Sequence, residues 1–214
     1  MNVSEALSSR KSVRAFKADA VDKKVMMEIL EKAARTPSWA NSQPWTVFVA
    51  AGETLKRIRE AYIDSYKNAV KTVTDIARPT EWPQAAKDRT MGLRPDMVRD
   101  CGEAADQFGE LNQRMFDAPA VIFLCVDKLY SPWALYDLGA YSQSVMLLAQ
   151  ERGLSTIPAI TSVAYPDVLR KELKIPDSLH VAIGIPIGYA DDTNAINKLH
   201  TLRDSAETVV RFTD

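Results

Sequence analysis

Three cations and a hydroxyl fall within the short run from Arg10 to Arg14, just past an expected helix end where the chain turns extended. In an extended segment the side chains of Arg10, Ser12 and Arg14 point to one side, and Lys11 points to the other. Arginine suits phosphate because its planar fork donates two parallel, charge-assisted hydrogen bonds. The run is a candidate anion site. Taken alone, such a run is more typical of a solvated surface stretch.

A second polar segment is the loop 36–43, which Pro37 and Pro44 bracket. Its hydroxyl and amide groups could read the edge of a flat heterocycle, because amides offer both donors and acceptors. The alternative is a polar turn before a strand, although Trp39 at the tip of a polar loop is typical of a contact residue. Near the end of the chain Arg203 would, by itself, be a surface arginine.

The sequence lacks the motifs of several common cofactor, metal and nucleophile sites. The chain has only eight glycines, and neither GxGxxG nor GxxxxGK[ST] occurs, so no glycine loop is expected to cradle a pyrophosphate. HExxH, CxxC and GxSxG are also missing, and two histidines are too few for a histidine-rich metal site. Any phosphorylated cofactor must therefore be held by cationic side chains.

Composition limits the class of protein. The 214 residues suffice for one domain with a full core, and the net charge of −1 gives no general attraction to nucleic acid or an anionic membrane. The longest apolar run, 120–126, is far shorter than the roughly 20 residues that span a bilayer. Cys101 and Cys125 are expected to be buried free thiols. These features favour a cytoplasmic protein.

The elements that position these residues follow from apolar periodicity and turn signals. No repeat or long linker divides the chain, so residues 1–214 are expected to form one domain. Residues 78–95 contain prolines and little periodicity, which predicts an excursion or lid, and the tail 191–214 is expected to wrap a neighbour or its own surface. The pattern favours an α+β or three-layer architecture with a central sheet. The predicted helices are one ending near Ser9 and capped by Ser4, then 22–35, 53–76, 97–115, 131–152 (capped by Ser131 and ended by Gly153) and 166–173; the predicted strands are 45–50, 118–126 and 180–189.

Together these segments resemble the nitroreductase family along nearly the whole chain. The first two motifs are R-K-S-V-R-A-F near the start and A-A-R-T-P-S-W-A-N-S-Q-P-W about twenty residues on. F-D-A-P-A-V-I-F, L-L-A-Q-E-R-G-L-S-T-I-P, I-G-I-P-I-G-Y and a tail arginine follow. The segments F-D-A-P, A-Y-P-D-V and I-N-x-L-x-T-x-R are similar to those of a subgroup of nitrobenzoate and nitroaromatic reductases.

The resemblance implies a fold and a cofactor. The fold would be an α+β three-layer sandwich with a central, mainly antiparallel sheet flanked by helices. Two copies would form an intertwined homodimer with flavin sites at the interface, completed by tail exchange. Arg10, Ser12 and Arg203 would hold the FMN phosphate and ribityl chain. Lys11 and Arg14 would lie beside them, with Arg14 a candidate for the pyrimidine edge of the flavin.

The resemblance also implies that two further segments reach the flavin. A loop of the partner subunit would approach it, and a stretch of backbone would lie near the flavin N5. The loop residues are Pro37, Ser38, Trp39 and Asn41, and the backbone stretch is Pro158, Ala159, Ile160 and Thr161. Trp39 stands where a small residue is frequent in the family, and Ile160-Thr161 replaces the Glu-Gly of some members. Thr201 stands where some members have a second phosphate-binding cation.

The implied function is that of an FMN-dependent NAD(P)H oxidoreductase, which reduces small nitroaromatic or quinone substrates by ping-pong hydride transfer. NADH or NADPH would donate the electrons, the flavin N5 would carry the chemistry, and no catalytic side chain or metal is expected. Other reactions on the same fold remain open, namely dehalogenation, flavin cleavage and azoline oxidation. A flavin- or nucleotide-binding sensor without turnover is the non-catalytic alternative.

Overall fold

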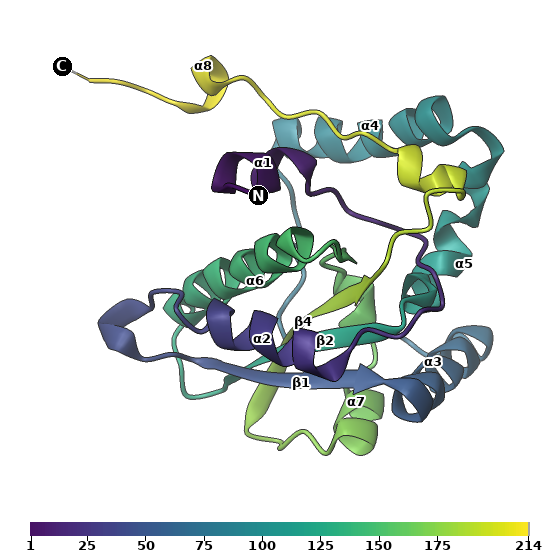
Figure 1. The fold of residues 1–214 in the computed structure, drawn as a ribbon, viewed down its shortest axis with the longest axis vertical. Helices are drawn as coiled ribbons and strands as arrows, with labels where there is room; N and C mark the ends of the chain where they lie inside the picture. Colours follow the sequence, from purple (N-terminus) through teal and green to yellow (C-terminus); the bar gives the residue numbers. More distant parts are fainter. Residues whose placement is uncertain (214) are drawn as a thin grey trace.

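The apolar run 120–126 forms the centre of an antiparallel sheet in the computed structural model, which describes residues 1–213 (Figure 1). The strands lie in the order β1-β2-β4-β3. Phe123 faces Phe48 on β1 and Gly184 on β4, and the β2–β4 register shifts once, between Leu124 and Cys125. The strands are β1 (Trp45–Ala51), β2 (Ala120–Asp127), β3 (Ser155–Thr156) and β4 (Leu179–Gly188).

Helices cover both faces of this sheet, so the expected α+β three-layer sandwich is confirmed. Successive side chains of β2 point to opposite faces. Ile122 packs in the cluster formed with α2 (Lys23–Ala33) and α6 (Trp133–Glu151). Phe123 packs in the cluster formed with α3 (Gly52–Lys67) and α7 (Pro166–Leu173).

A third apolar cluster joins the start of the chain to its end. Val13 packs there with Met97 and Ile196, between α4 (Gln84–Cys101) and α5 (Phe108–Gln113). The Asn197 side chain holds the two segments together: its Oδ1 accepts from the Arg14 backbone N–H at 2.7 Å, and its Nδ2 donates to the Ala15 carbonyl at 2.8 Å. Beyond this point the tail with α8 (Ala206–Val209) extends away from the body, whereas α1 (Val3–Ser9) lies against α6 (Figure 1).

The middle of the chain differs from the sequence prediction in three places. Helix α3 ends at Lys67 rather than at 76, because Ala69 adopts a left-handed φ of 50° and turns the chain away. Much of the expected excursion 78–95 is helical, since α4 begins at Gln84. The expected helix 97–115 is interrupted at Gly102, whose φ is 57°.

Of the three residues predicted to cap or end a helix, the structure confirms only one. Asn2, not Ser4, caps α1 by accepting from the Glu5 backbone N–H at 2.9 Å. The Ser131 side chain makes no cap to α6, which starts after Pro132. Gly153 ends α6 as expected, with a left-handed φ of 71°.

Both cysteines are buried free thiols, as predicted. Burial raises the pKa of Cys125 to about 12. Among the helices of residues 1–213, none has the length and hydrophobicity needed to cross a bilayer.

Candidate cofactor-binding site

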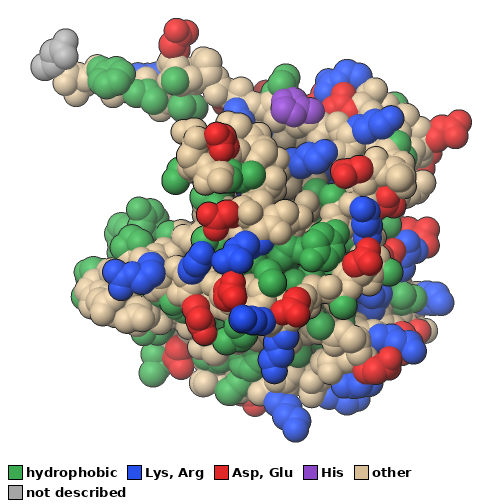
Figure 2. All heavy atoms as spheres, in the orientation of Figure 1, with side chains coloured by type: hydrophobic (Ala, Val, Ile, Leu, Met, Phe, Trp, Pro, Cys, Tyr) green, Lys and Arg blue, Asp and Glu red, His purple; other side chains and the backbone are tan. Residues whose placement is uncertain are grey.

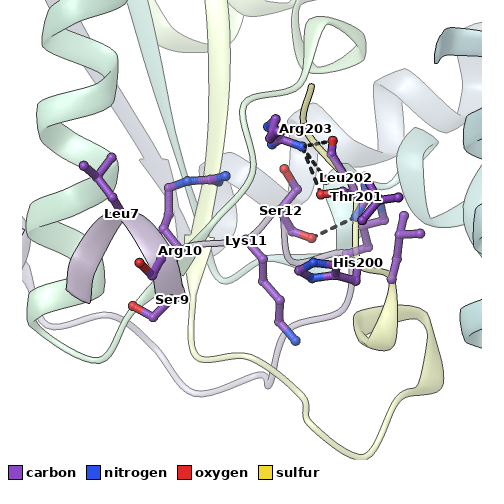
Figure 3. A pocket seen from close by; sticks show the side chains of 12 residues that line it. Leu7, Ser9, Arg10, Lys11, Ser12, His200, Thr201, Leu202 and Arg203 are labelled. Atoms are coloured by element: carbon purple, nitrogen blue, oxygen red, sulfur yellow. Dashed lines mark hydrogen bonds between the residues drawn. The ribbon is translucent and has the colours of Figure 1, made fainter. Parts of the chain in front are cut away.

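The two ends of the chain build one cavity of about 430 Å³. Its walls are residues 7–12 and Arg14 from the start of the chain and residues 199–203 from the end. Arg10 follows the last residue of α1, where the backbone turns extended. Figure 3 shows the Arg10 guanidinium reaching toward Ser12 and Arg203. The structure thus brings together the three residues predicted to hold a phosphate.

Arg10 and Arg203 lack a carboxylate partner among the residues that the structure describes. Within residues 1–213, no carboxylate pairs with Arg10 or Arg203, whose Nη1 donates instead to the Thr201 carbonyl and hydroxyl at 3.1 and 2.9 Å. Burial lowers the pKa of Arg10, and the positive charge of Arg203 lowers it further. Two guanidinium groups that repel each other in a partly buried cavity form a site for an anion with several oxygens.

Lys11 belongs to the wall of the same cavity but is turned elsewhere. Its ammonium donates to the Asn197 carbonyl at 2.7 Å. In Figure 3 the side chain extends away from Arg203. Lys11 therefore fastens the N-terminal segment to the C-terminal one and adds its charge only at a distance.

Arg14 is a buried cation that lacks a carboxylate partner among the described residues. Its side chain lies 5.9 Å from the centre of the Phe108 ring, and Nη1 donates to the Ser12 carbonyl at 2.9 Å. The residue is only 8% exposed, its Nε has no hydrogen-bond partner, and burial lowers its pKa. Buried donors are normally satisfied, so an unsatisfied Nε beside a cavity fits a ligand that accepts from it.

A second cavity, of about 270 Å³, continues from the first, because both contain Ser12 and Arg14. The predicted backbone stretch 158–161 forms one wall, and a 3₁₀ turn begins at Ile160. Thr161 Oγ1 donates to Asn112 Oδ1 at 2.5 Å across the cavity wall. The structure therefore brings Arg14 and the 158–161 backbone to one place, adjacent to the anion cavity.

Asn112 and Phe108 are lining residues that sequence reasoning missed. Both lie on α5 and face the second cavity. The sequence predicted one continuous helix here, in which a polar residue such as Asn112 is an ordinary surface position. The break at Gly102 redirects the chain and turns both side chains inward, and no motif in the sequence marks it.

The 36–43 loop lies apart from both cavities within one protomer. Pro37, Ser38 and Trp39 line a third cavity, of about 590 Å³, on another part of the molecule. Asn41 does not line it; its side chain accepts from Gln43 Nε2 at 3.2 Å. The predicted contact of this loop with a flavin needs a second copy of the chain and stays a prediction.

A three-layer sandwich with an anion cavity made from both chain ends defines a class of cofactor-binding α+β proteins. The chain belongs to the nitroreductase family, whose model matches residues 7–189. The chain is 28% identical to the 4-nitrobenzoate reductase of Pseudomonas putida, over 96% of this chain and 93% of that protein. It is also 28% identical to the chloronitrobenzene nitroreductase of Comamonas testosteroni, over 98% of this chain and 96% of that protein.

Solved structures give the same picture at the level of the fold. The FMN- and NADPH-dependent nitroreductase NfnB from Sphigopyxis sp. strain HMH superposes with a TM-score of 0.93 at 29% identity, over the whole of both chains. The FMN-dependent nitroreductase NfnB from Mycobacterium smegmatis, solved in complex with NADPH, superposes with a TM-score of 0.90 at 26% identity, again over the whole of both chains.

Proposed function

We propose that the protein is an FMN-dependent NAD(P)H oxidoreductase that reduces nitroaromatics or quinones. The observation that carries the proposal is the meeting of Arg10 and Arg203 at one cavity without a carboxylate partner among the described residues. The cofactors in the names of the structural relatives support it, since these are FMN and NADPH.

The cavity residues fit FMN without a glycine loop. Arg10, Ser12 and Arg203 would hold the phosphate of FMN. Arg14 and Asn112, which line the second cavity, would contact the pyrimidine part of the flavin, and the cation would favour the negative charge that reduction adds there. When bound, FMN would supply hydride and electron transfer between NADPH or NADH and the acceptor.

We infer that two copies form a homodimer with the cofactor sites at their interface. The accessible surface of the protomer is 12,850 Å², whereas a compact monomer of 23.8 kDa exposes about 9,900 Å². The tail projects from the body and carries hydrophobic side chains (Figure 2), of which Phe212 is 92% exposed. A partner covers the tail surface and brings its 36–43 loop to the cofactor.

The absorption spectrum of the purified protein tests the proposal. A yellow protein whose flavin band bleaches on adding NADPH or NADH, and returns on adding a nitroarene or quinone, is the expected result. A colourless protein that ignores added FMN contradicts it. Stopped-flow mixing separates the enzyme from a sensor, because a sensor leaves the bound flavin oxidised. The predicted cytoplasmic location can be tested by cell fractionation.

A further inference from the structure

An aromatic groove, defined here by Pro37, Ser38, Trp39, Trp133, Tyr136 and Asp137, lies where the 36–43 loop meets the start of α6. Its cavity is about 590 Å³, within the size range of small-molecule sites. Trp39, Trp133 and Tyr136 are 68%, 67% and 75% exposed. Three large aromatic side chains left uncovered around one hollow indicate a contact surface.

The groove is held in shape by its own hydrogen bonds. The Trp39 backbone N–H donates to Asp137 Oδ2 at 3.1 Å, and Ser38 Oγ accepts from the Gln43 backbone N–H at 2.9 Å. Ala40 and Asn41 have left-handed φ angles of 51° and 58°. Such strained residues persist only where their surroundings fix them, and they cluster at functional sites. The indole of Trp39 is therefore presented on a fixed loop.

The charged side chain that lines the groove is negative. No lysine or arginine is among its lining residues, and the only charged one is Asp137, which is 4% exposed. A carboxylate substituent on a ligand would lose its water and gain no cation in exchange, and it would be repelled by Asp137. The groove therefore suits a flat, uncharged ring.

We propose that the aromatic groove holds the ring of the electron acceptor and selects uncharged nitroarenes over carboxylated ones. This inference rests on the proposed function, in which Pro37, Ser38 and Trp39 reach the flavin of the partner subunit. Nitro groups withdraw electrons from a ring, and electron-rich indole and phenol rings stack well on such a face. Trp39, Trp133 and Tyr136 supply those rings.

A matched pair of substrates tests the charge selection. With FMN-loaded protein and NADPH, methyl 4-nitrobenzoate should have a kcat/KM at least about ten times that of 4-nitrobenzoate. Asp137→Asn keeps an acceptor for the Trp39 N–H and should narrow this ratio severalfold. Equal values for the two substrates, or a preference for the acid, would overturn the proposal.

Three variants test the position of the site. Trp133→Ala and Tyr136→Ala should each retain bound FMN and raise KM for the methyl ester by about five- to tenfold. Trp82→Ala is the matched control, because Trp82 is 49% exposed and lies outside the groove. A raised KM in the control together with an unchanged KM in the two groove variants would place the acceptor elsewhere.

Binding measured without turnover separates this inference from the proposed function. Calorimetric titration of the methyl ester into the oxidised, FMN-loaded protein should show binding that Trp133→Ala weakens. Failure to oxidise NADPH would refute the proposed function, whereas equal ester affinity in parent and variant would refute the groove. Conversion of Trp133→Ala to a monomer, with ester affinity unchanged, would show that partner side chains fill the groove and would also overturn it.

Discussion

The arginines of the candidate cofactor site differ from several others on the molecule in what they contact. Arg99 and Arg170 each pair with carboxylates, which is the usual arrangement for a surface cation. Arg10, Arg14 and Arg203 instead line the anion cavity, where Arg14 donates to a carbonyl and Arg203 donates to carbonyls and a hydroxyl. Their guanidinium groups can therefore donate hydrogen bonds to an anionic ligand.

Replacing Arg10 tests the phosphate contact. A charge-assisted hydrogen bond contributes roughly 1.5–3 kcal/mol, so Arg10→Ala should raise the Kd for FMN by about one to two orders of magnitude. Arg211→Ala is the matched control, because the Arg211 guanidinium contacts only carbonyls of the nearby tail. Fluorescence titration of the apoprotein measures both. An Arg10 variant that binds FMN as tightly as the parent would contradict the assignment.

Replacing Arg14 tests the ring end of the site. Loss of its charge should disfavour reduced flavin by roughly 1.5–3 kcal/mol, so Arg14→Gln should lower the two-electron midpoint potential of bound FMN by about 30–60 mV. Spectroelectrochemical titration measures the potential. Arg10→Ala, reconstituted with excess FMN, should change it much less, and equal shifts in both variants would argue against a ring contact for Arg14.

Part of the candidate site could be predicted at the residue scale, because a few side chains carry recognisable chemistry. The spacing of Arg10, Ser12 and Arg14 in an extended segment predicted a shared direction, and all three line the anion cavity. Asn112 could not be predicted, since its role depends on a helix break rather than on its neighbours in sequence. The orientation of Lys11 toward Asn197 depends likewise on a distant residue.

At the scale of elements, close packing between β4 and the turn that follows β3 fixes the wall of the second cavity. A Cβ at Gly184 would lie 2.5 Å from Ser162 Cβ, which real structures do not tolerate. Gly184→Ala should therefore cost about 1–3 kcal/mol of unfolding free energy. Gly92 lies on α4 with open space around it, so Gly92→Ala should raise the free energy of unfolding by about 0.5–1 kcal/mol. Urea titrations should show a lower free energy of unfolding for Gly184→Ala than for the parent, and a higher one for Gly92→Ala.

Helix α4 also holds the C-terminal segment in place. Asp100 accepts from the His200 backbone N–H at 3.0 Å, and Arg89 pairs with Asp204 at 2.7 Å. Asp100→Ala should raise the Kd for FMN by about three- to tenfold through loss of one positioned hydrogen bond next to Arg203. Asp96→Ala is the control, since its carboxylate pairs only with Arg99. Equal effects of the two substitutions would show that α4 acts only through its general stability.

The elements that sequence predicted well are those buried in the sandwich, where apolar runs and stripes are strong. Strand β2 and helix α6 are examples. Helix α4 has little apolar periodicity because only Met97 and Cys101 are buried along it, so the sequence predicted its end but not residues 84–96. Val70 continued the stripe of α3 by coincidence: the chain has already turned at Ala69, and Val70 is 49% exposed.

At the scale of the molecule, the protomer exposes more surface than its mass warrants, which underlies the proposed dimer. Light scattering coupled to size exclusion should give twice the mass of the chain. The midpoint of unfolding should rise with protein concentration, because association stabilises the folded state by mass action. Deleting 206–213 serves as the comparison and should weaken the dimer. A monomer at micromolar concentration would contradict this arrangement.

Arg10 and Arg203 line one cavity although they lie far apart in the sequence, which matters for synthesis and truncation of the chain. During synthesis the first arginine leaves the ribosome long before the second, so the binding site is complete only after Arg203 has been made. Products that terminate early, or that proteases trim from the carboxyl end, keep the sandwich core but lose half of the cationic pair. Retention of cofactor would then report that the polypeptide is intact from Arg10 to Arg203.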